Sequence, residues 1–291
     1  MQKHLTTRPG QGTAIAPALM LTPTVLVIVL FVALPFVGLL VSSFTGTGGY
    51  TLENYLSFFE DSFYLGVLLN TALTGALAAV FALVLGYPIA YYLRFGSDRA
   101  RRYIALAVLS PLLISVVVRS YALTLVIGPK NPFEQIIAQV IPDFHMNLLF
   151  SRAGVLIGLV YTLAPFMVLS LVASLSTIDA KMLSAARSLG AGTWTILRRI
   201  VFPLSVPGII SGCFTVFSLS VTSFVLPMML GGSGYKMLAQ LINQQILVLY
   251  NWPFGFAICV ILLAFNGVLL YISAKLVGRM LVSGLTLQKQ A

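Results

Sequence analysis

Charged residues are scarce in this chain of 291 residues. Aspartate, glutamate, lysine and arginine together make up 8% of it, whereas 59% of the residues are hydrophobic and the mean hydropathy is +1.00. Soluble domains carry roughly 25% charged residues. The shortage therefore excludes a soluble globular protein and indicates an integral membrane protein.

Residues that usually build catalytic or metal sites are also few. The two histidines, His4 and His145, are far apart, and the two cysteines, Cys213 and Cys259, lie inside apolar stretches, where cysteine is most often a small packing residue. The seven acidic residues are scattered, and there is no Gly-x-x-x-x-Gly-Lys-Ser/Thr loop for nucleotide phosphates. We therefore expect no metal, no cofactor and no catalysis in this chain.

What the chain has in abundance is long apolar stretches. About 20 predominantly apolar residues are enough to cross a membrane as a helix, and six stretches qualify, at residues 18–42, 66–93, 103–127, 153–175, 204–230 and 253–278. The sequence predicts an all-α integral membrane protein with six transmembrane helices. They form a single domain, 18–280, between an N-terminal tail at 1–17 and a C-terminal tail at 281–291.

The basic residues predict the orientation of these helices, because lysine and arginine are retained on the cytoplasmic side. With both termini in the cytoplasm, most of the 17 basic residues fall on that side, and only Lys130, Arg152 and Lys236 fall outside. This orientation places segment 176–203 in the cytoplasm. Topology and anionic headgroups also explain the net charge of +10. Without a clustered basic and aromatic surface, we expect no nucleic-acid partner.

A polar break separates the fourth and fifth apolar stretches. Its first part, 179–189, has the spacing of a short amphipathic helix, marked by the apolar residues Met182, Leu183, Ala186 and Leu189. Gly190 stands where a helix commonly ends, because glycine takes a left-handed conformation without a steric cost. A second amphipathic piece, 193–201, leads to Pro203. Residues 179–201 would thus form a compact knob for a partner, although an ordinary connecting loop could have the same spacing.

The knob resembles the EAA loop of binding-protein-dependent ABC importers. In that family Glu-Ala-Ala is followed after three residues by Gly and, nine residues later, by Ile-x-Leu-Pro. Every spacing is kept here by Ser184-Ala185-Ala186, Gly190, Ile200 and Pro203. Two identities differ, because Ser184 stands in place of the usual Glu and Phe202 in place of the usual Leu.

Other stretches are similar to the spermidine/putrescine permease subfamily, in order along the chain. They are Thr-Leu-Glu-Asn-Tyr at 51–55, Leu-Gly-Tyr-Pro at 85–88, Gly-Leu-Val-Tyr at 158–161, Pro-Phe-Met-Val at 165–168, Pro-Gly-Ile-Ile at 207–210 and Asn-Trp-Pro-Phe-Gly at 251–255. The resemblance therefore covers about residues 20–280. It implies the type I ABC importer (MetI-like) permease fold and a multi-pass protein of the bacterial inner membrane.

The resemblance also implies partners. These are a second, similar permease, two ATPase subunits that bind ATP and Mg²⁺, and a periplasmic solute-binding protein. Contact with the ATPase is then expected at Ser184, Ala185, Ala186, Arg187 and Gly190. Because Ser184 lacks the usual carboxylate, we expect a heterodimer whose second permease keeps the Glu.

Polar residues inside the apolar stretches are the candidates for a route through the membrane, because lipid offers them no hydrogen bonds. They are Asn70, Thr71, Thr74, Ser110, Ser115, Arg119, Ser218, Ser220, Thr222, Ser223 and Asn266. In the family the fifth span lines the path, which favours Ser220, Thr222, Ser223 and Phe224. The spacing of Ser220, Ser223 and Phe224 predicts one helical face. Alternatively, the hydroxyls bond to helix carbonyls or join helices. Arg119 either extends to the outer interface or faces the path or a partner.

The resemblance favours a polyamine, such as spermidine or putrescine, as the transported solute. All seven acidic residues lie outside the six apolar stretches, however, so that the chain offers a polycation no carboxylate within the membrane. The same machinery could carry another small solute, such as an opine, an aminophosphonate, thiamine or iron. An ion-coupled secondary transporter would need an acidic residue or a histidine in the membrane, and a structural or receptor-type protein would not explain the EAA-like loop.

Overall fold

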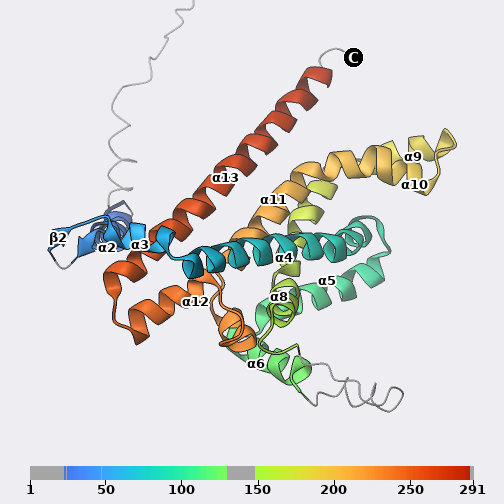
Figure 1. The fold of residues 1–291 in the computed structure, drawn as a ribbon. Coiled ribbons are helices and arrows are strands. Elements are labelled where there is room, and N and C mark those ends of the chain that lie inside the picture. Colours follow the sequence, from blue (N-terminus) through green and yellow to red (C-terminus); the bar gives the residue numbers. More distant parts are fainter. Residues whose placement is uncertain (1–22, 24, 47, 130–147, 289–291) are drawn as a thin grey trace, which may run out of the picture.

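Helices make up nearly all of the computed structural model, which describes residue 23 and residues 25–46, 48–129 and 148–288 (Figure 1). The only strands in this described part form a small antiparallel ladder, in which β1 (Thr45–Gly46) pairs with β2 (Gly49–Tyr50). The prediction of a helical protein is confirmed apart from this ladder. The tail expected at 1–17 lies outside the described residues.

Among the described residues, five helices are long and apolar enough to cross a membrane. Each corresponds to one predicted stretch, and they are Val25–Ser43, Ser62–Phe95 (α4), Arg152–Ser176 (α8), Thr193–Val221 and Trp252–Lys275. The first comprises η1 (Val29–Ala33) and α2 (Leu34–Ser43), and the last belongs to α13 (Trp252–Gln288). The residues expected to form a tail from 281 onward therefore prolong the last helix as far as Gln288.

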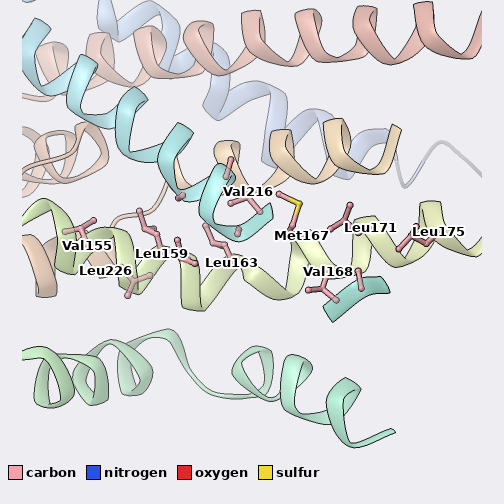
Figure 2. Close-up of a cluster of buried hydrophobic side chains, with 14 of the residues drawn as sticks. Val155, Leu159, Leu163, Met167, Val168, Leu171, Leu175, Val216 and Leu226 are labelled. Carbon is pink, nitrogen blue, oxygen red and sulfur yellow. The ribbon is translucent and has the colours of Figure 1, made fainter. Parts of the chain in front are cut away.

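The centre of the molecule is formed by α4, α8 and the helix that ends at Val221. One face of α8 contributes a buried side chain at every fourth position, and these are Val155, Leu159, Leu163, Met167, Leu171 and Leu175 (Figure 2). Two glycines let the neighbouring helix approach this face. A Cβ added at Gly212 would lie 2.6 Å from the Met167 sulfur, and one added at Gly208 would lie 2.4 Å from the Cβ of Ser174. Larger residues at either position would push these helices apart.

Contacts between helix ends fix their directions. α4 and α8 run the same way, because Arg94 at the end of α4 contacts Leu175 at the end of α8. α13 begins where α4 begins, since the ring of Phe254 packs against that of Tyr64 with 5.0 Å between centroids. We name the end of the bundle where α8 leads into the knob the knob end, and the opposite end the far end. The short helices α3 (Glu53–Glu60) and α12 (Leu238–Asn243) lie at the far end (Figure 1).

The third predicted span is broken. Instead of one helix over 103–127, the chain forms α5 (Asp98–Leu113) and α6 (Val116–Ile127), which are bent by 105° relative to each other. The third apolar stretch is therefore helical, as predicted, but it is not one straight helix. α5 continues through Pro111 to Leu113, and Ile114 then takes an extended backbone conformation. The chain counts six spans only if this bent pair is taken as one.

The fifth predicted span begins and ends earlier than expected. A continuous helix is formed by α10 (Thr193–Ile196), η2 (Leu197–Val201) and α11 (Phe202–Val221). Pro203 does not interrupt it, because the preceding π-helical turn, with the Phe202 amide bonded to the Leu197 carbonyl, widens the helix where the ring enters. The helix stops at Val221, so the prediction that it continues to residue 230 is wrong. A π-helical turn, η3 (Pro227–Gly231), follows after the break.

The first span packs chiefly on the last. In the most apolar stretch of 18 consecutive residues of Val25–Ser43, no residue is buried within this chain. The main neighbour of α2 is α13. Most of this helix therefore faces lipid or another subunit.

Candidate functional site

The knob begins with the predicted short helix, and the structure shows that it is capped. α9 (Ala180–Ser188) starts after Asp179, whose carboxylate accepts a hydrogen bond from the Lys181 amide at 2.9 Å. Leu183 of α9 and Ile196 of α10 are both buried and belong to the central hydrophobic core. The knob is therefore packed onto the spans rather than hanging from them.

The knob turns at a glycine. Gly190 has a φ of +81°, its amide donates to the Arg187 carbonyl at 2.9 Å, and the amide of Ala191 donates to the Ala186 carbonyl at 3.0 Å. These two bonds make up a Schellman motif, which ends a helix with a left-handed residue. The prediction of a helix stop at Gly190 is confirmed.

The surface of the knob is apolar at its tip. Leu189 is 88% exposed, Trp194 is 72% exposed and Met182 is 49% exposed. Of the four residues that mark the amphipathic face of α9, only Leu183 and Ala186 pack inward. The sequence analysis missed Trp194, although a large aromatic residue in a polar segment is a signal for an exposed contact. Exposed basic residues surround the tip, namely Lys181, Arg187, Arg198 and Arg199.

The expected ATPase-contact residues all lie on this knob. Ser184, Ala185, Arg187 and Gly190 are exposed, and Ala186 is half-buried against the core. The structure thus brings together the residues that the loop motif singled out.

Arg119 is buried within the chain. Its side chain is only 8% exposed, and its guanidinium donates a hydrogen bond to the Pro111 carbonyl in the last turn of α5. Within this chain the side chain is therefore turned inward, and a role of Arg119 in a path or at a partner stays a prediction. Arg119 connects the two halves of the bent third span.

The four expected path residues do not share one face. Ser220 is fully buried, with no hydrogen-bond partner for its hydroxyl among the described residues. Thr222 is exposed at the end of α11, and its hydroxyl donates to the Ser218 carbonyl at 2.9 Å. Ser223 and Phe224 follow the end of the helix and are half-buried. The prediction of a common helical face is wrong because α11 ends at Val221.

A different row of hydroxyls follows α11. Ser211, Thr215, Ser218 and Thr222 recur every three or four residues, so they share one face of the helix. All four are exposed or half-buried. The row meets α8, where the hydroxyl of Ser170 lies 2.8 Å from that of Ser211.

The row reaches a cavity of about 560 Å³ between α2, α11, α12 and α13, lined by Ser218, Thr222 and Asn266 among apolar residues. The Asn266 amide nitrogen donates to the Ser218 hydroxyl at 2.8 Å. Its amide oxygen is buried and accepts no hydrogen bond from the described residues. The Thr222 hydroxyl donates its hydrogen to a carbonyl, so that its oxygen is left as an acceptor. The Thr222 oxygen and the Asn266 amide oxygen therefore both offer lone pairs to a donor. Asn266 and Ser218 were among the polar residues of the sequence, but their pairing needed the structure.

The sequence of the chain matches a known family of proteins. Residues 12–282 match the family described as the binding-protein-dependent transport system inner membrane component. The chain belongs to this family. It is 32% identical over 253 residues to the spermidine/putrescine transport system permease protein PotB of Escherichia coli (strain K12), and the alignment covers 84% of this chain and 92% of that protein.

Solved structures of two transporters share the fold. A bacterial ABC transporter involved in the import of the acidic polysaccharide alginate superposes with a TM-score of 0.76 at 16% identity, covering 91% of this chain and 96% of the compared chain. The MetNI methionine ABC transporter, in an inward-facing conformation, gives a TM-score of 0.59 at 17% identity, covering 74% and 95%. The MetI-like permease fold expected from the sequence is thereby confirmed.

Membership defines the general role of the chain. It is a membrane permease subunit of an ABC importer that works with an ATPase and a binding protein. ATP hydrolysis belongs to a separate subunit, so this chain is a transport subunit rather than an enzyme.

Proposed function

We propose that this permease carries a polyamine, such as spermidine or putrescine, from a periplasmic binding protein into the cytoplasm of a bacterium. The observation that supports this most strongly is the 32% identity to a spermidine/putrescine permease over 84% of the chain. It forms a heterodimer with a second permease in the inner membrane, with two ATPases that bind ATP and Mg²⁺ on the cytoplasmic side.

The distribution of charge supports an orientation with the knob in the cytoplasm. Basic residues are concentrated at the knob end, and they are Arg94, Arg99, Arg101, Arg102, Lys181, Arg187, Arg198 and Arg199. Such an excess is typical of the cytoplasmic side. Both ends of the chain then lie in the cytoplasm.

The tip of the knob inserts into a cleft of the ATPase. Leu189 and Trp194 are the anchors, because large exposed apolar side chains gain most from removal from water. The basic residues around the tip favour an acidic rim on that cleft. Ser184 offers no carboxylate for a charge-assisted bond, and the second permease supplies it with the usual Glu.

The route through the membrane follows the hydroxyl row of α11. A polyamine carries ammonium groups, which only donate hydrogen bonds, and the Asn266 oxygen and the Thr222 hydroxyl offer acceptors. No carboxylate of this chain lies within the apolar stretches. Binding along the row is therefore weak, which suits a path whose selectivity is set by the binding protein.

The test is reconstitution of this permease with its partner permease, ATPase and binding protein in proteoliposomes. We expect ATP-dependent uptake of radiolabelled spermidine or putrescine that requires the binding protein. Opines, aminophosphonates, thiamine and ferric iron serve as competitors. If one of these is taken up and polyamines neither enter nor compete, the polyamine assignment is wrong.

A further inference from the structure

Arg94, in the last turn of α4, holds the base of the knob. Its Nε donates to the Leu175 carbonyl at 3.2 Å and its Nη2 donates to the Ile178 carbonyl at 2.9 Å. Leu175 lies in the last turn of α8, and Ile178 lies two residues before α9 begins. One side chain of α4 therefore bridges the point at which α8 passes into the knob.

The chemistry of this contact is specific to arginine. The guanidinium presents several donors in a fixed fork, so that it reaches two carbonyls at once, which an ammonium does poorly. The last carbonyls of a helix also carry partial negative charge and lack partners within the helix. The ring of Phe95 adds a contact, because its centroid lies 5.2 Å from the guanidinium carbon.

The other end of α4 is held in a similar way at the far end of the bundle. The Tyr235 hydroxyl donates to the Asn70 carbonyl at 3.0 Å and also bonds to the Thr74 hydroxyl. Arg152 at the start of α8 donates to the Asn70 side-chain oxygen at 2.6 Å, and its guanidinium carbon lies 5.4 Å from the centre of the Tyr235 ring. Tyr235 belongs to the segment that joins η3 to α12.

A further bond ties this segment to α4. The Thr71 hydroxyl, buried in α4, accepts a hydrogen bond from the amide of Leu238, the first residue of α12, at 2.9 Å. The segment 232–238 therefore cannot move relative to α4 without breaking several hydrogen bonds. Ser233 and Lys236 of this segment border a cavity of about 410 Å³ that opens beside the start of α4.

The two bonded ends of α4 are separated by the thickness of a membrane. Asn70 and Arg94 lie 24 positions apart on one continuous helix, which corresponds to about 36 Å at 1.5 Å per residue, compared with about 30 Å for the hydrocarbon core. We propose that α4 is a rod connecting the knob to segment 232–238 at the far end, and that Arg94 and Tyr235 are the positioning residues that fix its two ends. The inference rests on the proposed contact between knob and ATPase but not on the identity of the solute.

The experiment follows the far end while ATP acts at the knob end. A single reactive cysteine is placed by Ser233→Cys, at an exposed position of segment 232–238, in a background with Cys213→Ala and Cys259→Ala. The permease complex with its ATPase is labelled with a water-soluble maleimide, once without nucleotide and once with trapped ATP. We expect the labelling rate to change by about fivefold or more, as for a typical coupling between sites.

The variants separate the rod from simple packing. Arg94→Gln and Tyr235→Phe should each lower the ratio of the two labelling rates part of the way towards one, while the complex still assembles and basal ATPase activity stays unchanged. Arg94→Lys, which keeps the charge but loses the fork, should give an intermediate ratio. The matched controls are Arg99→Gln and Tyr121→Phe, because both side chains are exposed and lie away from the described contacts of the knob base and of segment 232–238.

A double variant gives the decisive comparison. Effects of distant, independent sites add, whereas two ends of one connection do not. Arg94→Gln combined with Tyr235→Phe should therefore reduce the response no further than either change alone. Three outcomes would overturn the rod. The labelling rate of Ser233→Cys could be the same with and without ATP in the otherwise unaltered complex, the losses of the two variants could add, or the variants could behave like the controls. Failure of polyamine uptake with an intact ATP response would overturn only the proposed solute.

Discussion

The guanidinium of Arg119 donates a hydrogen bond to the carbonyl of Pro111 across the 105° bend between α5 and α6. A helix that ends inside a membrane leaves its last carbonyls without partners, and no water reaches them in the hydrocarbon core. Arg119 supplies the missing donor from the next helix. The bend and the buried arginine thus depend on each other.

Replacing Arg119 by methionine should destabilise the permease. The change keeps much of the side-chain volume but leaves the Pro111 carbonyl without this donor, and an unsatisfied buried acceptor costs about 1–3 kcal/mol. The measurement is the thermal unfolding temperature of the purified protein in detergent. Arg102→Met, at an exposed position of α5, is the control and should have little effect. Equal unfolding temperatures for the two variants would mean that the bend does not need Arg119.

Gly190 allows a prediction that depends on backbone conformation alone. A Cβ at Gly190 or at Gly192 would meet no atom within 4 Å, but only Gly190 has a positive φ. Gly190→Ala should therefore cost about 1–2 kcal/mol of local stability and lower ATPase coupling, whereas Gly192→Ala should not. Gly190→Asn should recover much of the loss, because asparagine tolerates this conformation. ATPase activity stimulated by the binding protein is the measurement, and equal behaviour of the two alanine variants would contradict the explanation.

The exposed tip of the knob predicts where the ATPase is held. Leu189→Ser and Trp194→Ser should each weaken copurification of the ATPase by roughly tenfold or more, as expected for buried anchors of an interface. Trp252→Ser serves as the control, because Trp252 is half-exposed at the far end. ATPase recovery that is unchanged in both knob variants would place the contact elsewhere.

Thr222 and Ser220 are two residues apart, but we expect opposite results when each is replaced by cysteine and labelled. In a background without the two native cysteines, a cysteine at Thr222 should react with a small water-soluble thiol reagent, and the rate should change when ATP is trapped. A cysteine at Ser220 should stay unreactive, because that side chain is fully buried. The ratio of labelling rates is the measurement. A reactive Ser220→Cys together with an inert Thr222→Cys would move the path to the opposite face of α11.

Local signals in the sequence predicted the knob well. The amphipathic spacing and the glycine stop both act within a few residues, so the pattern contains the information needed. Pro203 was the exception. It marks a helix start by local rules, but the π-helical turn before it lets the helix continue from the knob into the span.

The remaining errors concern contacts between distant residues. Hydropathy alone does not reveal that the apolar stretch 204–230 stops being helical at Val221, nor that 103–127 bends, because both breaks lie within apolar sequence. The position of Arg119 and the pairing of Asn266 with Ser218 depend on how helices meet. The sequence indicated that these polar residues needed partners but not which partners they had.

The packing of the first span on α13 has a consequence for biogenesis. The ribosome makes Val25–Ser43 before the spans that lie between it and α13, so this helix enters the bilayer long before its main neighbour exists. A contact between residues so far apart in sequence forms slowly, because the loop-closure entropy is lost before the contact stabilises the chain. The permease therefore stays an open, incompletely assembled bundle until α13 has been made, and a second subunit has that whole interval in which to cover the exposed first helix.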